Sequence, residues 1–153
     1  NTIIYHYVKK ELSMEIIANA VQTVAANQNV YFTDEVTSGN CAIEHRDGSG
    51  LITLRGLTNT QCRARFRVHF GANIAIATGG IVEPISLAIA LDGEAIPSTI
   101  MTITPAAVGN FFNVSSSIFI DIPKGCCSHV SIRNISTQAI DVQNANLIAE
   151  RSA

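Results

Sequence analysis

The feature that most constrains this chain is a series of short apolar segments between Pro84 and Arg151, separated by turn-forming residues. Val, Ile, Leu and Phe fill the segments, while Gly, Pro, Asn and Asp stand between them, where unusual backbone angles are tolerated. We expect strands over residues 85–91, 99–104, 113–122, 130–134 and 139–150, with a turn at Asp92–Gly93. The pattern predicts an all-β fold, namely an antiparallel β-sandwich.

The preceding part of the chain continues this pattern. Shorter segments at residues 20–24, 29–32, 41–45 and 51–54 are expected to be strands, and the Gly-rich segment 46–50 is expected to be a hairpin turn. In the last strand the alternation of apolar residues changes parity, which predicts a β-bulge near Asn144. We therefore expect one sandwich domain over residues 19–153, preceded by an N-terminal arm over residues 1–18.

Residues 62–70 show the clearest alternation in the chain. Ala64, Phe66, Val68 and Phe70 alternate with Arg63, Arg65, Arg67 and His69, so the apolar set is expected to face the core. Two interpretations of the arginines stay open. They lie either on a solvated face of a sheet or in a subunit or partner interface, where guanidinium groups bind carboxylates well. The site residues predicted on the second interpretation are Arg63, Arg65 and Arg67.

The arm differs in character from the domain. Its first residues are apolar and aromatic, and the segment 12–20 fits a helix as well as a strand. Because free termini usually fray, we expect an ordered arm to dock on something. The residues predicted to dock are Ile3, Ile4, Tyr5, Tyr7 and Val8.

Composition narrows the class of protein. Charged residues make up 14% of the 153-residue chain and hydrophobic residues 47%. The charged share of an average soluble domain is about 25%, so we expect much of this surface to be covered by other copies or by a partner. The net charge of −2 does not favour nucleic acid. We also expect no leader, because the first residues lack a basic segment followed by a long apolar core, and no membrane span, because Gly79–Gly80, Glu83 and Pro84 interrupt the most apolar stretch.

Four cysteines are present: Cys41, Cys62, Cys126 and Cys127. Neighbouring strand residues point to opposite faces, so Cys126 and Cys127 are not expected to bond to each other. We expect all four to be reduced and buried. The alternative is a disulfide between Cys41 and Cys62, which requires an oxidising compartment.

No catalytic residue, metal site or cofactor is predicted. The four histidines are scattered along the chain, and no glycine-rich phosphate loop or nucleophile elbow is present. The aromatic residues that could stack on a sugar are Tyr31, Phe32, Phe111 and Phe112.

Three sequence features between residues 85 and 151 carry a resemblance to a known family. They are a strand ISLAIALDGE that ends in an Asp-Gly turn, an FNVS strand followed by IPKG, and the closing run VQNANLIAER. In this order they resemble the tumour-necrosis-factor-like jelly roll of the complement head, and most of all its bacterial and phage branch. The C-terminal domain of collagen-like exosporium glycoproteins is an example of that branch.

The resemblance implies a homotrimeric, non-enzymatic jelly-roll domain, consistent with burial of a shared face by cyclic symmetry. A short arm stands where the exosporium proteins have a collagen stalk. We therefore expect a knob on a phage virion, as a capsid decoration, head fibre or small spike, docked through the arm to a capsid or other virion protein. One alternative is a module of a bacterial cell or spore surface. Another is a fibre head that binds a glycan or receptor.

Overall fold

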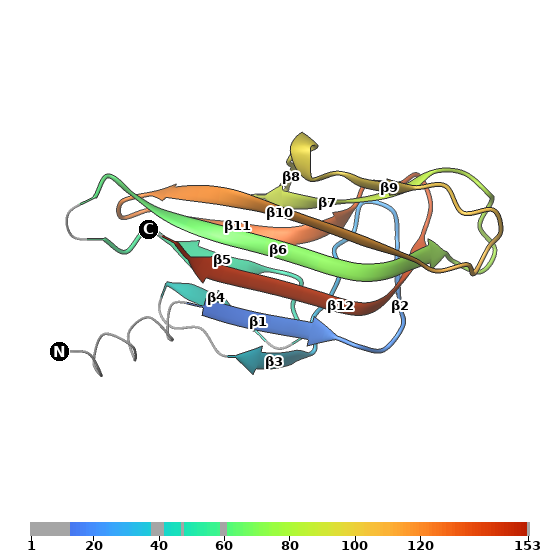
Figure 1. Ribbon diagram of the computed structural model, residues 1–153, viewed down its shortest axis with the longest axis horizontal. Helices are drawn as coiled ribbons and strands as arrows, with labels where there is room; N and C mark the ends of the chain where they lie inside the picture. The colour runs from blue at the N-terminus through green and yellow to red at the C-terminus, as the bar shows by residue number, and fades with distance from the viewer. Residues whose placement is uncertain (1–12, 38–41, 47, 59–60, 153) are drawn as a thin grey trace.

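The computed structural model describes residues 13–37, 42–46, 48–58 and 61–152, and they form two antiparallel sheets packed face to face (Figure 1). Each sheet has six strands. The prediction of an all-β antiparallel sandwich is confirmed. Among the described residues, no helix is long and apolar enough to cross a membrane.

Sheet A has the strand order β10-β6-β12-β1-β3, with β2 paired to β12. Its strands are β1 (Ser13–Ala18), β2 (Gln22–Val24), β3 (Asp34–Thr37), β6 (Arg63–Ile76), β10 (Phe112–Pro123) and β12 (Ile140–Arg151). Sheet B has the order β4-β5-β11-β7-β8, with β9 paired to β7. Its strands are β4 (Ile43–His45), β5 (Ile52–Arg55), β7 (Ile85–Leu91), β8 (Glu94–Ala95), β9 (Met101–Ile103) and β11 (Cys127–Asn134), and a 3-10 turn, η1 (Pro97–Thr99), precedes β9.

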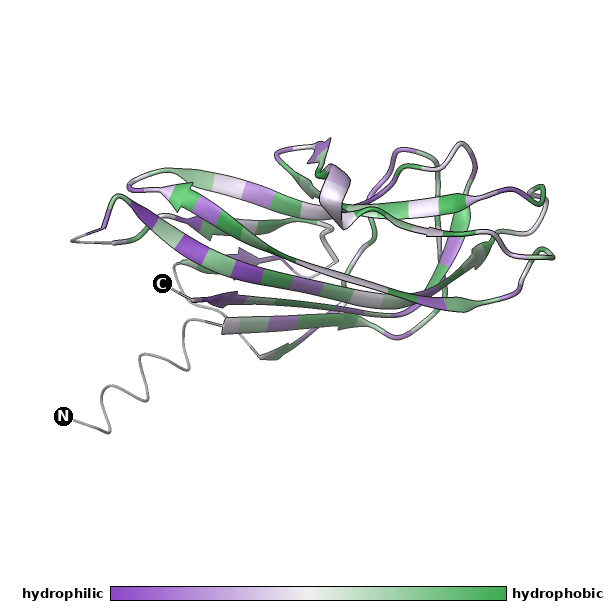
Figure 2. Ribbon diagram, turned by 45° about the horizontal axis from the view of Figure 1, so that its top comes forward, coloured by the Kyte–Doolittle hydropathy of each residue, from purple (hydrophilic) through white to green (hydrophobic). Residues whose placement is uncertain are grey.

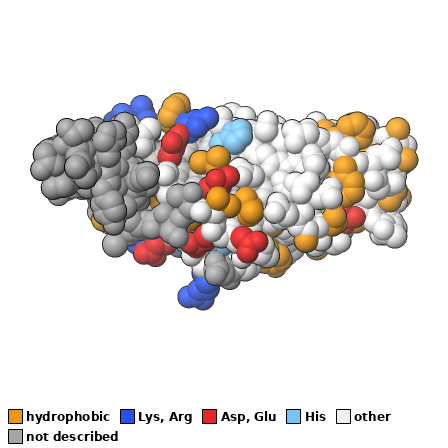
Figure 3. Space-filling view, turned by 60° about the horizontal axis from the view of Figure 1, so that its bottom comes forward, with side chains coloured by type: hydrophobic (Ala, Val, Ile, Leu, Met, Phe, Trp, Pro, Cys, Tyr) orange, Lys and Arg blue, Asp and Glu red, His pale blue; other side chains and the backbone are white. Residues whose placement is uncertain are grey.

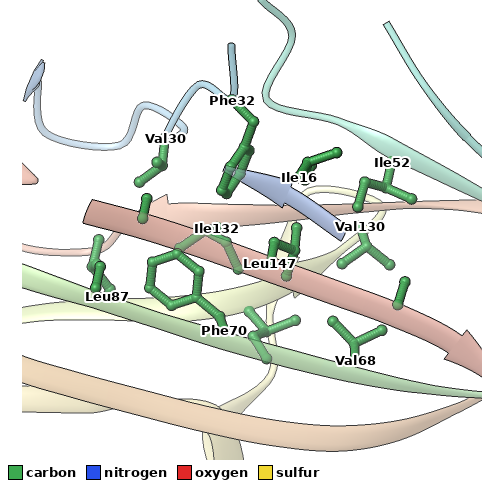
Figure 4. Close-up of a cluster of buried hydrophobic side chains, with 14 of the residues drawn as sticks. Ile16, Val30, Phe32, Ile52, Val68, Phe70, Leu87, Val130, Ile132 and Leu147 are labelled. Carbon is green, nitrogen blue, oxygen red and sulfur yellow. The ribbon is translucent and has the colours of Figure 1, made fainter. Parts of the chain in front are cut away.

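Both sheets contribute to one core. Along β6 the predicted inward residues are fully buried while the arginines point outward, and Figure 2 shows the same alternation of polar and apolar residues along β12 and β1. Figure 4 shows Phe32 and Phe70 at the centre of this core, with Leu147 of sheet A and Ile132 of sheet B beside them. The two phenylalanine rings meet edge to face, with centroids 6.4 Å apart.

Several predicted strands agree closely with the structure, and others do not. β7 spans the predicted residues 85–91, and the register of β12 shifts between Gln143 and Asn146, which confirms the bulge at Asn144. The prediction of a strand at residues 29–32 is wrong. This segment makes one isolated bridge, Asn29 to Arg133, because it crosses between the sheets to bury Val30 and Phe32.

The segment that fitted both helix and strand forms β1. It pairs with β12 on one side and β3 on the other, and its inward residues Met14, Ile16 and Ala18 are buried. The last six residues of the predicted arm, 13–18, are therefore part of sheet A. The predicted docking residues Ile3, Ile4, Tyr5, Tyr7 and Val8 lie outside the described residues.

The expectation that the cysteines are buried is wrong at three positions, whereas the expectation that they are reduced agrees with the structure there. Cys62, Cys126 and Cys127 carry free thiols and are exposed, so the alternative disulfide to Cys62 is not formed. Cys62 lies just before β6 and Cys126 lies in the turn between β10 and β11, both outside the sheet interior. The residue type alone does not show whether a cysteine is buried or exposed. Cys41 lies outside the described residues.

The elongated sandwich has two distinct ends (Figure 1). We call the end where β6 and β1 begin and β10 and β12 finish the base. The opposite end, formed by the loops β6–β7 and β9–β10, is the tip. The antiparallel register fixes this arrangement, since Arg63 pairs with Pro123 at the base and Ile74 pairs with Phe112 near the tip. The first described residue, Ser13, pairs with Glu150 near the base, so the chain enters the sandwich there.

Candidate assembly face

The outer face of sheet A, which points away from the core, is built of rows of side chains in register. One row near the base runs Phe119, Arg67, Glu150 and Ser13 across β10, β6, β12 and β1. The next row towards the tip runs Ser117, His69, Ile148 and Glu15. Side chains in one row are about 5 Å apart, so the content of each row decides what the face can bind.

The three predicted arginines lie together on this face, and each has a carboxylate partner. Arg67 Nη1 lies 3.0 Å from Glu150 Oε1. Arg65 donates two hydrogen bonds to Asp121, at 2.8 and 3.2 Å, and Arg63 Nε lies 3.0 Å from the same carboxylate. Three guanidinium groups thus share two carboxylates, which leaves an excess of positive charge at this corner of the sheet.

These contacts shift the acid–base equilibria of the pair. The hydrogen bonds from Arg65, helped by the charges of Arg65 and Arg63, hold the pKa of the Asp121 carboxyl below its usual range despite partial desolvation. The hydrogen bond and charge of Asp121 raise the pKa of Arg65 in return. Because both side chains are solvent-accessible, the pair orders this corner more than it stabilises the fold.

A large aromatic side chain stands in the charged region. Phe119 on β10 is 60% exposed, and the guanidinium carbon of Arg65 lies 5.9 Å from its ring centroid. The sequence contained a signal for this residue, because Phe119 shares the parity of Ser115, Ser117 and Asp121 rather than that of the buried residues. It is therefore an apolar side chain on the polar face of its strand, and the sequence analysis missed it.

The exposed large apolar residues within strands are confined to one sheet. Among the described strands, they are Phe112 and Phe119 on β10 and Val36 on β3, which are the two edge strands of sheet A. The described strands of sheet B carry none. Exposed apolar groups on edge strands mark surfaces that another chain covers, or surfaces that aggregate.

The middle of the face is small, polar and sparsely charged. Gly71 and Ser115 pair with each other there, and Asn113 donates a 3.1 Å hydrogen bond to Asn73 nearer the tip. The His69 ring is only half-exposed, and its Nδ1 has no hydrogen-bond partner among the described residues. A water molecule or an added chain can supply a partner for this nitrogen.

The edge of sheet B differs from the outer face of sheet A because it borders a pocket. A pocket of about 680 Å³, lined by residues such as Glu35, His45 and His129, opens between the edge strands β3 and β4. His45 Nε2 donates to the Ser49 carbonyl at 2.9 Å, and its Nδ1 lies 3.5 Å from Glu35 Oε1. None of the described residues that line this pocket is Phe, Tyr or Trp, which does not favour stacking on a sugar.

The described residues also bear on two other kinds of site, a metal site and an aromatic site that could stack on a sugar. No group of three or more His, Cys, Asp or Glu side chains among them is arranged to hold a metal ion. Of the four aromatics considered for sugar stacking, Phe32 is fully buried, whereas Tyr31, Phe111 and Phe112 are exposed. Phe111 and Phe112 lie near the tip together with Ile81 and Val82, and Figure 3 shows apolar side chains gathered at the end away from most of the charged groups.

Comparisons with known proteins agree on the fold. No family model and no curated protein matches the sequence. The Eiger TNF structure from S. frugiperda matches with a TM-score of 0.66 and 10% identity, covering 93% of this chain and 92% of that one. Murine APRIL matches at 0.61 and 7%, covering 90% and 98%, and the globular domain of the zebrafish complement 1qA protein at 0.58 and 14%, covering 88% and 94%.

These likenesses confirm the jelly-roll part of the predicted resemblance, and the fold matches that of non-enzymatic domains of the TNF and complement-head type. The identities are too low to carry more than architecture. The chain is thus a two-sheet antiparallel jelly roll of the tumour-necrosis-factor type.

Proposed function

We propose that this chain is a non-enzymatic structural knob that assembles into a homotrimer through the outer face of sheet A. The observation that carries the proposal is the exposed Phe119 on the outer face of the edge strand β10, together with the exposed Val36 on the other edge strand, β3, while the described strands of sheet B expose no large apolar residue. In a lone molecule these residues would remain in water. Covering them with another copy stabilises the assembly by roughly 25 cal/mol per Å² of apolar surface buried.

The fold suggests that the assembly contains three copies, and the composition supports a covered face. TNF-like and complement-head-like domains usually form homotrimers, and this chain has the low charge expected of a domain with a covered face. Closed cyclic symmetry then buries the same surface on every copy. The Nδ1 of His69 on this face has no partner among the described residues, and an added chain can supply one.

The display site is the second part of the proposal. We place the knob on the surface of a phage virion, docked through the N-terminal arm to a capsid or other virion protein. The resemblance to the bacterial and phage branch supports this placement. The entry of the chain at the base is consistent with it, because the tip then points away from the particle. A bacterial cell or spore surface is the alternative.

The assembly is tested by light scattering on the purified chain over a range of concentrations. We expect a particle of three times the 16.3 kDa chain mass. A monomer at every concentration would contradict the proposal, because the apolar edges of sheet A would then have no occupant.

The location is tested by immunogold labelling of purified virions, cells and spores from the source, with an antibody against the tip loops. We expect gold on virions. Attachment of added protein to virions should fail when residues 1–12 are deleted, while the trimer mass stays unchanged. Gold on cells or spores and not on virions would contradict the virion placement and favour the alternative.

A further inference from the structure

The two ends of the sandwich differ in the chemistry of their side chains. The base carries the three outward arginines of β6 and their carboxylate partners. The opposite end is closed by the loops β6–β7 (77–84), β9–β10 (104–111) and β11–β12 (135–139), which we call the tip loops. Together these loops contain one charged residue, Glu83. The tip is therefore almost free of charge.

The one acidic side chain at the tip is engaged within the chain. Thr137 Oγ1 donates a 2.7 Å hydrogen bond to Glu83 Oε1, and Glu83 is half-buried. The tip loops contain neither lysine nor arginine that could attract an anionic surface. A partner that binds through ion pairs is therefore not favoured at this end of the molecule.

Large apolar side chains project from the tip into solvent instead. Ile81 is 64% exposed and Val82 is 55% exposed, both on the β6–β7 loop. Val108 and Phe111 on the β9–β10 loop and Phe112 at the start of β10 are exposed as well. Single apolar residues are normal on a protein surface, but a group gathered at one end marks a binding surface.

The two loops that carry these side chains are tied to the same strand. The Gly109 N–H donates to the Ile76 carbonyl at 3.2 Å, which holds the β9–β10 loop against the end of β6, where the β6–β7 loop begins. Phe112 pairs in register with Ile74 of β6. Figure 1 shows both loops at the same end of the sandwich. The five apolar side chains therefore project from one end of the molecule.

The backbone of the β6–β7 loop is paired within the chain. Gln138 Oε1 accepts a 2.9 Å hydrogen bond from the Ile81 N–H, and Gln138 Nε2 donates to the Ile81 carbonyl at 2.8 Å. The Gly80 N–H donates to the Ala77 carbonyl at 3.0 Å. Lipid offers no hydrogen bonds, so a segment that enters it must satisfy its backbone polar groups internally. Ile81, the most exposed apolar residue of the tip, meets this requirement.

We propose that the tip of each copy inserts its exposed apolar side chains into the boundary between the headgroups and acyl chains of a lipid bilayer. Protruding apolar side chains, paired backbone groups and the absence of cationic residues suit an uncharged, zwitterionic bilayer. A protein partner is less favoured, because tyrosine, tryptophan and arginine, which dominate the energetics of protein interfaces, are absent from the tip loops.

This inference goes beyond the proposed function, which gives the tip no binding role. The site lies within one copy of the chain, so it does not depend on the trimer. A trimer would present three tips, and it would hold a bilayer more tightly than one copy because the second and third contacts are intramolecular.

The inference is tested by flotation of the purified chain with phosphatidylcholine vesicles. We expect the double variant Ile81→Ser, Val82→Ser and the single variant Phe111→Ser each to lower the vesicle partition coefficient by roughly tenfold, because each removes apolar surface from the bilayer. Ile100→Ser is the matched control outside the tip loops, where 46% of the side chain is exposed, and it should leave the coefficient unchanged.

Charge provides a second control. Because the tip loops contain no lysine or arginine, we expect neither the addition of phosphatidylserine to the vesicles nor a higher salt concentration to change the partition coefficient. Binding that requires phosphatidylserine and is lost at high salt would overturn the inference, since it would assign the contact to charge rather than to the apolar tip.

A fluorescent reporter locates the contact on the molecule. The chain contains no tryptophan, so a single introduced indole is observed without background. In Phe111→Trp, which keeps a large aromatic ring at the tip, we expect vesicles of brominated phosphatidylcholine to quench the fluorescence. Ile100→Trp should not be quenched. Far-UV circular dichroism checks that each variant folds, and the tryptophan variants keep the test independent of the serine variants.

The outcomes distinguish this inference from the proposed function. A wild-type chain that does not bind the vesicles would overturn the tip contact and favour a protein partner. Equal quenching at positions 100 and 111, or unchanged binding by the tip serine variants, would overturn it as well. Light scattering should give one mass for the wild type and the tip variants, so these failures leave the trimer standing. A monomer that still binds the vesicles would overturn the trimer alone.

Discussion

The two sheets of this sandwich share one core and yet have outer faces of different character. Sheet A carries the exposed ring of Phe119 and a paired arginine cluster. Sheet B presents short polar and charged side chains, among them the ion pair of Arg55 with Glu44 at 2.9 Å. The inner faces of both sheets are buried in one apolar core. Folding therefore explains the inner faces, and the proposed assembly through sheet A would account for the difference between the outer faces.

The largest expected effect is on the stability of the hydrophobic core that the two sheets share. Replacing Phe70 by Ala removes a fully buried ring that contacts Phe32 across the core, and we expect a loss of about 3–5 kcal/mol in the free energy of unfolding. Urea denaturation should still show one cooperative transition. Separate transitions for the two sheets would show that they do not form one cooperative unit.

The next effect should be confined to sheet A. Phe119→Ser removes the exposed ring on β10, and we expect trimer dissociation to become easier by about 2 kcal/mol per contact, as for a central aromatic of an interface. Ile100→Ser is the matched control on the sheet B side, where 46% of the side chain is exposed. Sedimentation equilibrium measures both variants. Equal effects would mean that the sheets do not differ in assembly.

A smaller effect is expected from the arginines. Replacing Arg63, Arg65 and Arg67 together by Ser should weaken the trimer by roughly 1–2 kcal/mol per contact while the monomer stays folded, because paired surface charges contribute little to the fold itself. Light scattering with circular dichroism checks this. An unchanged dissociation concentration would favour the solvated-face interpretation.

The smallest effect concerns pH. Because the folded-state pKa of Asp121 is lowered by Arg65, its contribution to stability is present above the unfolded pKa of about 4 and is lost as the pH falls through the lower folded value. We expect Asp121→Asn to flatten the decrease of the melting temperature in this acid range. Glu94→Gln on sheet B provides the comparison, and an equal flattening there would exclude a specific role for the arginine pair.

Much of the fold was predictable because it follows from alternation. The strand at residues 85–91, the outward arginines of β6 and the bulge at Asn144 all follow from period-two patterns and turn chemistry. β1 was ambiguous because Ile17, an apolar residue, occupies an outward position and interrupts its alternation. β3 was missed because Asp-Glu-Val-Thr carries no apolar face, as is common at the edge of a sheet.

The candidate face was only partly predictable. The parity of β6 placed the three arginines on one side, but their carboxylate partners Asp121 and Glu150 come from distant strands and could not be paired from sequence. Phe119 could have been found from the sequence, because it is an apolar residue at a position that alternates with the polar residues of its strand. The positions of Phe119 and Val36 required the strand order, because nothing in the sequence shows that β10 and β3 stand at opposite edges of the same sheet.

The most direct test of the central claim, that sheet A and not sheet B is the assembly face, is hydroxyl-radical footprinting read by mass spectrometry. The account predicts that oxidation of Phe119 falls as the concentration passes through the range where trimers form. Oxidation of His129, exposed on the outer face of sheet B, should stay constant over the same range. Assembly that protects His129 while Phe119 remains fully reactive would contradict the account.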